Sequence, residues 1–182
     1  MYNAIGMVEL SSIARGIYTA DQMIKTAAVE AVSCTAVCPG KYIVLIQGDV
    51  AAVESSVDAG IQSAGEYIVD HFIIPNVHPG IFPAISSTTL PEQRAALGII
   101  ESFSLASMIH SADAALKAAD IQGVELRLGS GLGGKAYFTF TGDVAAVEAA
   151  ADAGKALVRD SGLLVDIEVI PSPAERLWDS LL

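Results

Sequence analysis

The heptapeptide Gly-Asp-Val-Ala-Ala-Val-Glu stands at residues 48–54 and recurs unchanged at residues 142–148, 94 positions later. Near the start of the chain, Ile-Gly-Met-Val-Glu at residues 5–9 is echoed by Leu-Gly-Ile-Ile-Glu at residues 97–101, 92 positions later. A seven-residue identity inside a shared pattern is far outside chance. The chain is therefore a tandem duplication of one unit, and the second copy gains two residues between these two segments.

Each copy predicts the same order of secondary structure. In the first copy, residues 4–10 alternate as a short strand, and residues 12–27 carry apolar side chains at helical spacing (Ile13, Ile17, Ala20, Ile24, Ala28). Two β-branched runs, residues 29–37 and 41–47, flank the turn signal Cys38-Pro39-Gly40 and predict a hairpin. Asp49 occupies an N-cap position before a second helix with the apolar stripe Val50, Val53, Val57 and Ile61, and residues 69–75 close the unit as a strand.

The resulting β-α-β-β-α-β order predicts the α+β class. We expect two tandem ferredoxin-like domains, each an antiparallel sheet with both helices on one face. The expected boundaries are residues 1–80 for the first domain, 81–95 for a linker rich in Pro, Ser and Thr, and 96–182 for the second domain. Near the end, Pro173 to Trp178 predicts a short helix with Pro in its first turn, which docks Leu177, Trp178 and Leu181.

Composition excludes several classes of function. The net charge is -11, so a nucleic-acid phosphate backbone would be repelled. No apolar run approaches the roughly 20 residues that cross a bilayer, and no basic segment precedes an apolar one at the N-terminus. We therefore expect a soluble, unexported protein with reduced thiols. Cys34 and Cys38 lie four residues apart in an extended segment, about 13 Å between Cα atoms, which is too far for a disulfide.

The motifs of both copies resemble the bacterial microcompartment shell domain. The resemblance rests on Ala-Ile-Gly at residues 4–6 with Glu9, on Asp21 to Lys25, and on the Gly-Asp-Val-Ala-Ala-Val junction. The hairpin loop Val37 to Lys41, together with the segments His78-Pro79, Pro83 to Ser86, Val169 to Pro171 and Trp178, resembles the tandem-domain shell proteins of the propanediol-utilisation compartment. One departure concerns the Pro-Arg-Pro-His that ends many single-domain relatives, because here Pro75-Asn76-Val77-His78 and Pro171-Ser172-Pro173-Ala174 stand instead.

The resemblance implies a cytoplasmic, non-enzymatic shell component that assembles as a homotrimer, a pseudohexameric tile that contacts other shell proteins. It also implies that Cys38 is the metal ligand and cofactor-binding residue, one from each of three chains. These cysteines would hold an iron–sulfur cluster of the [4Fe-4S] type at the central pore for electron transport, with a redox partner in the lumen or the cytosol. Three cysteines leave one iron of a four-iron cluster for another ligand. Pro39 and Gly40 would fix the turn, whereas Cys34 is expected to pack in the core.

The second copy places a glycine-rich loop where the first has its cysteine. Gly129-Ser130-Gly131-Leu132-Gly133-Gly134 matches G-x-G-x-x-G, and Leu132 lies 94 positions after Cys38. A dinucleotide site needs this motif to open a helix, but here it joins residues 124–128 to residues 135–140, both predicted strands. We therefore interpret Gly131, Leu132 and Gly133 as lining the same central pore as Cys38.

The remaining polar residues carry weaker hypotheses. Lys25 and Lys117 occupy equal positions in the two copies and, by resemblance, belong at the edge of the tile; a solvated helix face explains them equally well. The three histidines, His71, His78 and His110, have no ligand spacing and are assigned no role. No carboxylate pair stands beside a nucleophile or base. The alternative function is a soluble ferredoxin-like regulatory or enzymatic protein that binds a small ligand.

Overall fold

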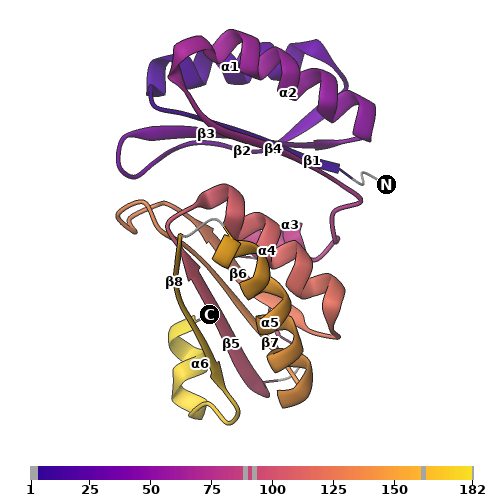
Figure 1. Cartoon of the computed structure of the whole chain (residues 1–182), viewed down its shortest axis with the longest axis vertical. Helices are drawn as coiled ribbons and strands as arrows, with labels where there is room; N and C mark the ends of the chain where they lie inside the picture. Colours follow the sequence, from indigo (N-terminus) through magenta and orange to yellow (C-terminus); the bar gives the residue numbers. More distant parts are fainter. Residues whose placement is uncertain (1–3, 88–89, 92–93, 161–162, 182) are drawn as a thin grey trace. The chain divides into compact units, whose positions relative to one another are not determined.

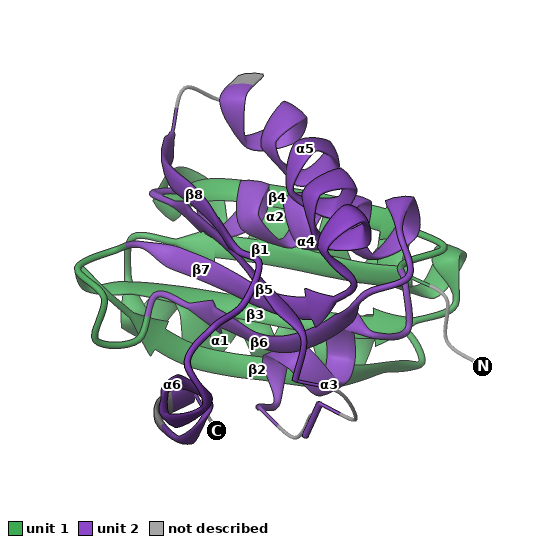
Figure 2. Ribbon diagram, turned by 90° about the horizontal axis from the view of Figure 1, so that it is seen from below, with its two compact units in different colours: residues 1–77, 130–134 green, residues 78–129, 135–182 purple. Residues whose placement is uncertain are grey.

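The computed structural model describes residues 4–87, 90–91, 94–160 and 163–181. It divides into two compact units, coloured separately in Figure 2. Unit 1 comprises residues 1–77 with residues 130–134, and unit 2 comprises residues 78–129 with residues 135–182. No helix in these described ranges combines the length and the apolar character that a membrane span requires.

Unit 1 is a two-layer α+β sandwich of a four-stranded antiparallel sheet and two helices, as predicted (Figure 1). The sheet order is β2-β3-β1-β4, which is the order of the ferredoxin-like unit. The core between the layers contains Val8, Met23, Val44 and Val53. The elements are β1 (Ala4–Leu10), α1 (Ile13–Thr26), β2 (Val29–Val37), β3 (Lys41–Gly48), α2 (Val50–Ala64), the 3-10 turn η1 (Gly65–Tyr67) and β4 (Ile68–Pro75).

Unit 2 repeats this fold and adds two short helices. Its sheet order is β6-β7-β5-β8, antiparallel throughout, and α4 and α5 pack against each other and against the sheet. The elements are α3 (Ile81–Ile85), β5 (Ala96–Ser102), α4 (Leu105–Ala118), β6 (Gln122–Leu128), β7 (Ala136–Gly142), α5 (Val144–Asp160), β8 (Leu164–Ile170) and α6 (Glu175–Leu181). The helix caps also repeat, because Ser12 and Ser104 both accept a backbone N–H three residues on. Asp49 is the N-cap of α2, as predicted, although its side chain makes no capping hydrogen bond.

Strand register locates the two-residue gain of the second copy. Glu9 pairs with Ile43 and the equivalent Glu101 pairs with Tyr137, so equivalent residues of the third strands are 94 positions apart in the sequence. The second strands have matching bulges at Ala31 and Gly123, so their equivalent residues are only 92 positions apart. The extra residues therefore lie in the hairpin loop between β6 and β7. Outside this loop, the two sheets share the same strand order and the same antiparallel pairing.

The apolar spacing of residues 12–27 correctly predicts the helix α1 but does not mark its buried face. The buried residues are Gly16, Thr19, Ala20 and Met23, whereas the isoleucines of the spacing, Ile13, Ile17 and Ile24, are all exposed. The cause is close packing at Gly16, where an added Cβ would lie 2.5 Å from Tyr42 Cβ on β3. Only glycine lets the helix approach the sheet this closely.

The two added helices lie where the sequence predicts a linker and a docking tail. In the linker range, Ile81–Ile85 forms α3 with Ile81 and Ala84 buried, and α3 packs against β6. Pro83 is compatible with this helix because the first turn needs no donated N–H. At the C-terminal end α6 begins at Glu175, two residues after Pro173, and buries Trp178 against Leu97 and Val124.

Candidate functional site

The candidate site is the hairpin turn Cys38-Pro39-Gly40, which joins β2 to β3 in unit 1. Val37 and Lys41 form the last strand pair before the turn. Gly40 has φ 77°, a left-handed conformation that favours glycine, and the Cys38–Pro39 peptide bond is cis. The Cys38 thiol is free and half-buried, while Pro39 and Gly40 are exposed. The turn therefore presents one thiol at the tip of a short, uncrowded loop.

The glycine-rich loop of the second copy belongs to the same compact unit as this turn. A Cβ added at Gly134 would lie 3.3 Å from Pro39 Cδ and 3.5 Å from the Cys38 carbonyl oxygen, and Gly134 has φ 91°. Gly131 and Gly133 also have positive φ, and an added Cβ there would meet nothing within 4 Å. Close backbone approach beside Cys38 thus depends on glycine at position 134.

The loop setting contradicts a dinucleotide site. The loop runs directly into β7, so no helix N-terminus follows the glycines. Gly40 and Gly134 both have positive φ and both precede the lysine that begins or adjoins the third strand. Counting back from these glycines aligns Leu132, which is half-buried, with Cys38. The two loops are equivalent in position, but only the first supplies a thiol.

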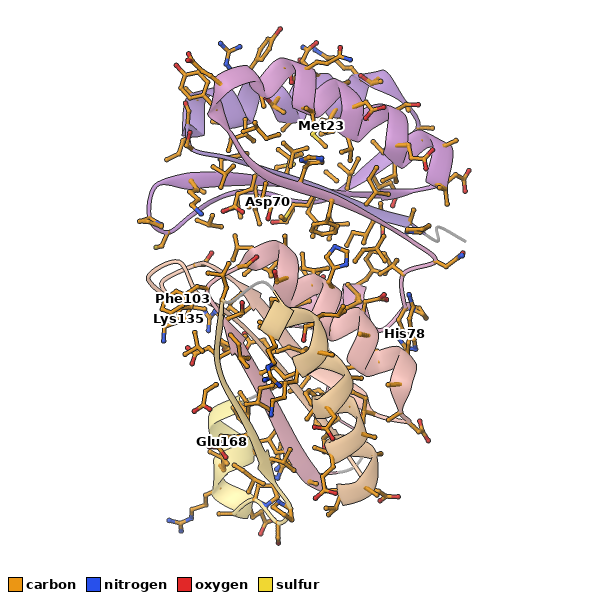
Figure 3. The ribbon with its side chains drawn as sticks, viewed as in Figure 1. Met23, Asp70, His78, Phe103, Lys135 and Glu168 are labelled. Atoms are coloured by element: carbon orange, nitrogen blue, oxygen red, sulfur yellow. The ribbon has the colours of Figure 1, made fainter. Side chains whose placement is uncertain are left out.

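Each loop is anchored by an ion pair that sequence reasoning missed. Lys41 Nζ lies 2.8 Å from Glu9 Oε1, and Lys135 Nζ lies 2.7 Å from Glu101 Oε1. Figure 3 shows Lys135 beside Phe103, whose ring centroid is 5.9 Å from Lys135 Nζ. The signal was the duplication itself, because both glutamates and both lysines recur at matching positions. These pairs hold the first residue after each loop against the first strand of its sheet.

The two ion pairs differ in burial, which predicts unequal effects of removing the lysine. The Glu9 side chain is 5% exposed, whereas that of Glu101 is 31% exposed. Lys41→Ala leaves a buried carboxylate unpaired and is expected to lower the free energy of unfolding by about 2 kcal/mol or more. Lys135→Ala is expected to cost about 1 kcal/mol or less, because water solvates Glu101. Urea unfolding of the two variants measures the difference, and equal losses would contradict this ranking.

Cys34 occupies a different environment from Cys38. It lies on β2 opposite Val44 and packs against the core of unit 1, as the sequence predicts. Burial raises the pKa of the Cys34 thiol. Desolvation likewise raises the pKa of the neighbouring Tyr42, with a smaller contribution from Cys34. A thiol with a raised pKa forms thiolate less readily and is a poorer metal ligand. Both cysteines are free thiols in the structure.

The described residues of one chain do not form a metal site alone. Among them, no group of three or more His, Cys, Asp or Glu side chains could hold a metal ion. A half-buried thiol beside open glycine positions fits the thiolate chemistry that iron–sulfur clusters require.

The two lysines predicted at a tile edge each pair with an aspartate one helical turn earlier. Lys25 Nζ lies 2.7 Å from Asp21 on α1, and Lys117 Nζ lies 2.6 Å from Asp113 on α4. Both lysine side chains are exposed, at 70% and 42%. They are therefore available to a neighbouring molecule.

Comparisons with known proteins agree with this architecture. The model of the BMC (bacterial microcompartment) domain family matches residues 4–77 and 96–173. The bacterial microcompartment shell protein PduT of Citrobacter freundii is 38% identical over 182 residues, 100% of this chain and 99% of its own. The carboxysome assembly protein CcmO of Synechococcus elongatus is 28% identical over 98% of this chain and 68% of its own.

Solved structures give the same result. A microcompartment protein from Desulfitobacterium hafniense has a TM-score of 0.93 and 53% sequence identity, covering 97% of this chain and 98% of its own. The fused permuted hexameric shell protein MSM0275 of the RMM microcompartment has a TM-score of 0.60 at 21% identity, over 86% of this chain and 81% of its own, and shows the fold alone. The sequence resemblance is confirmed: the chain belongs to the bacterial microcompartment domain family and carries two of its domains in tandem.

Proposed function

We propose that this protein is a structural component of a bacterial microcompartment shell in the cytoplasm. Three tandem chains form a six-domain, pseudohexameric tile, and the three Cys38 thiolates meet at its axis to hold one iron–sulfur cluster. The carrying observation is the free Cys38 thiol at the tip of a hairpin in one repeat only. Because each chain supplies one Cys38 thiol, a site with three thiolates forms only when three chains assemble. The full-length similarity to a named shell protein supports the structural role.

The residues around Cys38 suit such a cluster. Pro39 and Gly40 leave the turn exposed, and the positions of Gly131 and Gly133 have no neighbouring atoms that would crowd an inorganic group. Cys34 packs against the core and its pKa is raised by burial, so it is not the proposed ligand. A cluster bound by three thiolates supplies one-electron exchange and keeps one iron open to a fourth ligand.

The proposed role of the cluster is electron transfer across the shell. Cys38 would bind and orient it, and the loop of residues 130–134 would close the opening around it. A redox partner in the lumen or the cytosol would exchange the electron. Lys25 and Lys117 would contact neighbouring shell proteins at the tile edge. The chain contributes no catalytic residue to this function.

Protein purified without oxygen tests the proposal. We expect a brown trimer with about four iron and four sulfide per three chains, and an electron paramagnetic resonance signal on reduction or oxidation. Light scattering on the same sample measures the mass. A colourless, iron-free protein would contradict the cluster, and a stable monomer at micromolar concentration would contradict the tile. A colourless protein that binds a small molecule would favour the regulatory alternative.

A further inference from the structure

Asp113 on α4 has two partners in unit 2. Its carboxylate accepts the backbone N–H of His78 at 2.7 Å and the Lys117 ammonium at 2.6 Å. His78, labelled in Figure 3, begins the segment that follows the first repeat, and Gly80 in that segment lies close to Leu116. Asp113 therefore fixes the chain that leaves β4 onto the first helix of the second repeat.

In the first repeat, the corresponding face of α1 is exposed, and we call it the bare face. Asp21 is equivalent to Asp113, yet the Asp21 side chain is 48% exposed and the Asp113 side chain only 9%. Asp21 accepts hydrogen bonds from Gln22 and Lys25 on its own helix. Ile17 is 58% exposed, while the equivalent Ile109 is fully buried. Ile13 and Ile24 are exposed as well, and their equivalents Leu105 and Leu116 are buried. Among the described residues, one face of α1 thus has the same chemistry as a buried face of α4 but is exposed.

Strand register identifies the segment that matches this bare face. Ile5 pairs with Ile74 and the equivalent Leu97 pairs with Ile170, so the segments after β4 and β8 are 96 positions apart. Ala174 is then the equivalent of His78. Ser172 and Ala174 are exposed and, unlike Pro171 and Pro173, each carries a backbone N–H. The second repeat therefore offers a backbone N–H, carried by an exposed residue, that matches the exposed acceptor Asp21.

We propose that Asp21 accepts the backbone N–H of Ala174 from a second copy of this chain, and that the segment of residues 171–174 lies along the Ile13, Ile17 and Ile24 face of α1. This contact rests on the proposed trimer and names its subunit interface. It uses the same hydrogen bond that Asp113 makes within one chain. A head-to-tail contact of this kind closes into a ring when the rotation between successive chains is right. The second repeat of each chain then contacts the first repeat of the next, so no end of the tandem chain is left without a neighbour.

The test compares trimer dissociation of Asp21→Ala with wild type. A hydrogen bond to a charged acceptor is worth about tenfold in affinity or more at each interface. Three interfaces lost together lower the assembly constant about a thousandfold, which raises the midpoint concentration of a monomer–trimer equilibrium about thirtyfold. Fluorescence-detected sedimentation is run at a urea concentration where wild-type trimer is half dissociated. Ala174→Pro removes the donor and is expected to give the same shift.

Two controls separate this contact from other effects. Lys25→Ala removes the Asp21–Lys25 pair but keeps the acceptor, so its midpoint is expected to stay within about threefold of wild type. The Asp21→Ala, Ala174→Pro double variant is expected to be no weaker than either single variant, because both remove one interaction. Additive effects, or a wild-type midpoint in Asp21→Ala, would overturn the contact while leaving the tile intact. A monomeric wild type would instead overturn the proposed function.

Discussion

Cys38→Ser protein is expected to lose its iron, falling from about four atoms per three chains to near zero, while it keeps its fold and its trimeric mass. A serine hydroxyl is a poor substitute for a soft thiolate. Because every chain supplies the same ligand, one substitution removes all three ligands at once. Cys38 lies in an exposed turn, so its loss should disturb little packing. Iron and sulfide analysis with visible absorbance measures the result.

The matched control is Cys34→Ser, which changes the cysteine four residues earlier, on the strand β2 that leads into the turn. This variant should retain iron and colour but lose some stability, because Cys34 packs against the core of unit 1 and a hydroxyl there is partly buried. Full iron in Cys38→Ser, or bleaching in Cys34→Ser, would show that the ligand has been assigned to the wrong cysteine. Both variants are compared as anaerobically purified trimers.

Trp178→Ala is expected to detach α6 and to lower the melting temperature of the protein by about 10 °C. Trp178 is 2% exposed and packs against Leu97 and Val124, and truncating a buried tryptophan costs about 3–5 kcal/mol. A helix as short as Glu175–Leu181 is not stable without its packing. Calorimetry measures the melting temperature, and limited proteolysis reports whether residues 171–181 become susceptible.

Phe103→Ala is the control for the loss of an aromatic side chain. Phe103 is 54% exposed and contacts the Lys135 ammonium through its ring, an interaction worth about 1 kcal/mol or less. Its melting temperature should fall by no more than about 3 °C. Wild-type resistance to proteolysis in Trp178→Ala would mean that the strand β8 and the remaining side chains hold α6 without the tryptophan.

The strands and helices were predictable from the sequence because the duplication repeats each apolar pattern, so the two copies support one another. The bounds of β1 and β2 agree with the predicted ranges, and Cys34 packs in the core as expected. The buried face of α1 was not predictable from apolar spacing, since the helix carries two apolar faces and only the packing of Gly16 on Tyr42 selects the inner one. The pairs Glu9–Lys41 and Glu101–Lys135 join residues far apart in the sequence. The duplication marks these four residues because they recur, but only strand register shows which of them lie side by side.

The unequal hairpin loops have a consequence for stoichiometry. In a ring built from single-domain subunits, any substitution at the axis appears six times. In a ring of three tandem chains, a change in one loop appears three times, and the other loop can vary independently. The two loops have diverged in this way: the first is a short turn with Cys38, and the second is a longer glycine-rich turn with Leu132. In the proposed trimer, duplication followed by divergence at one hairpin would thus convert a sixfold constraint on composition into a threefold one, and three thiolates would leave a four-iron cluster one free coordination site.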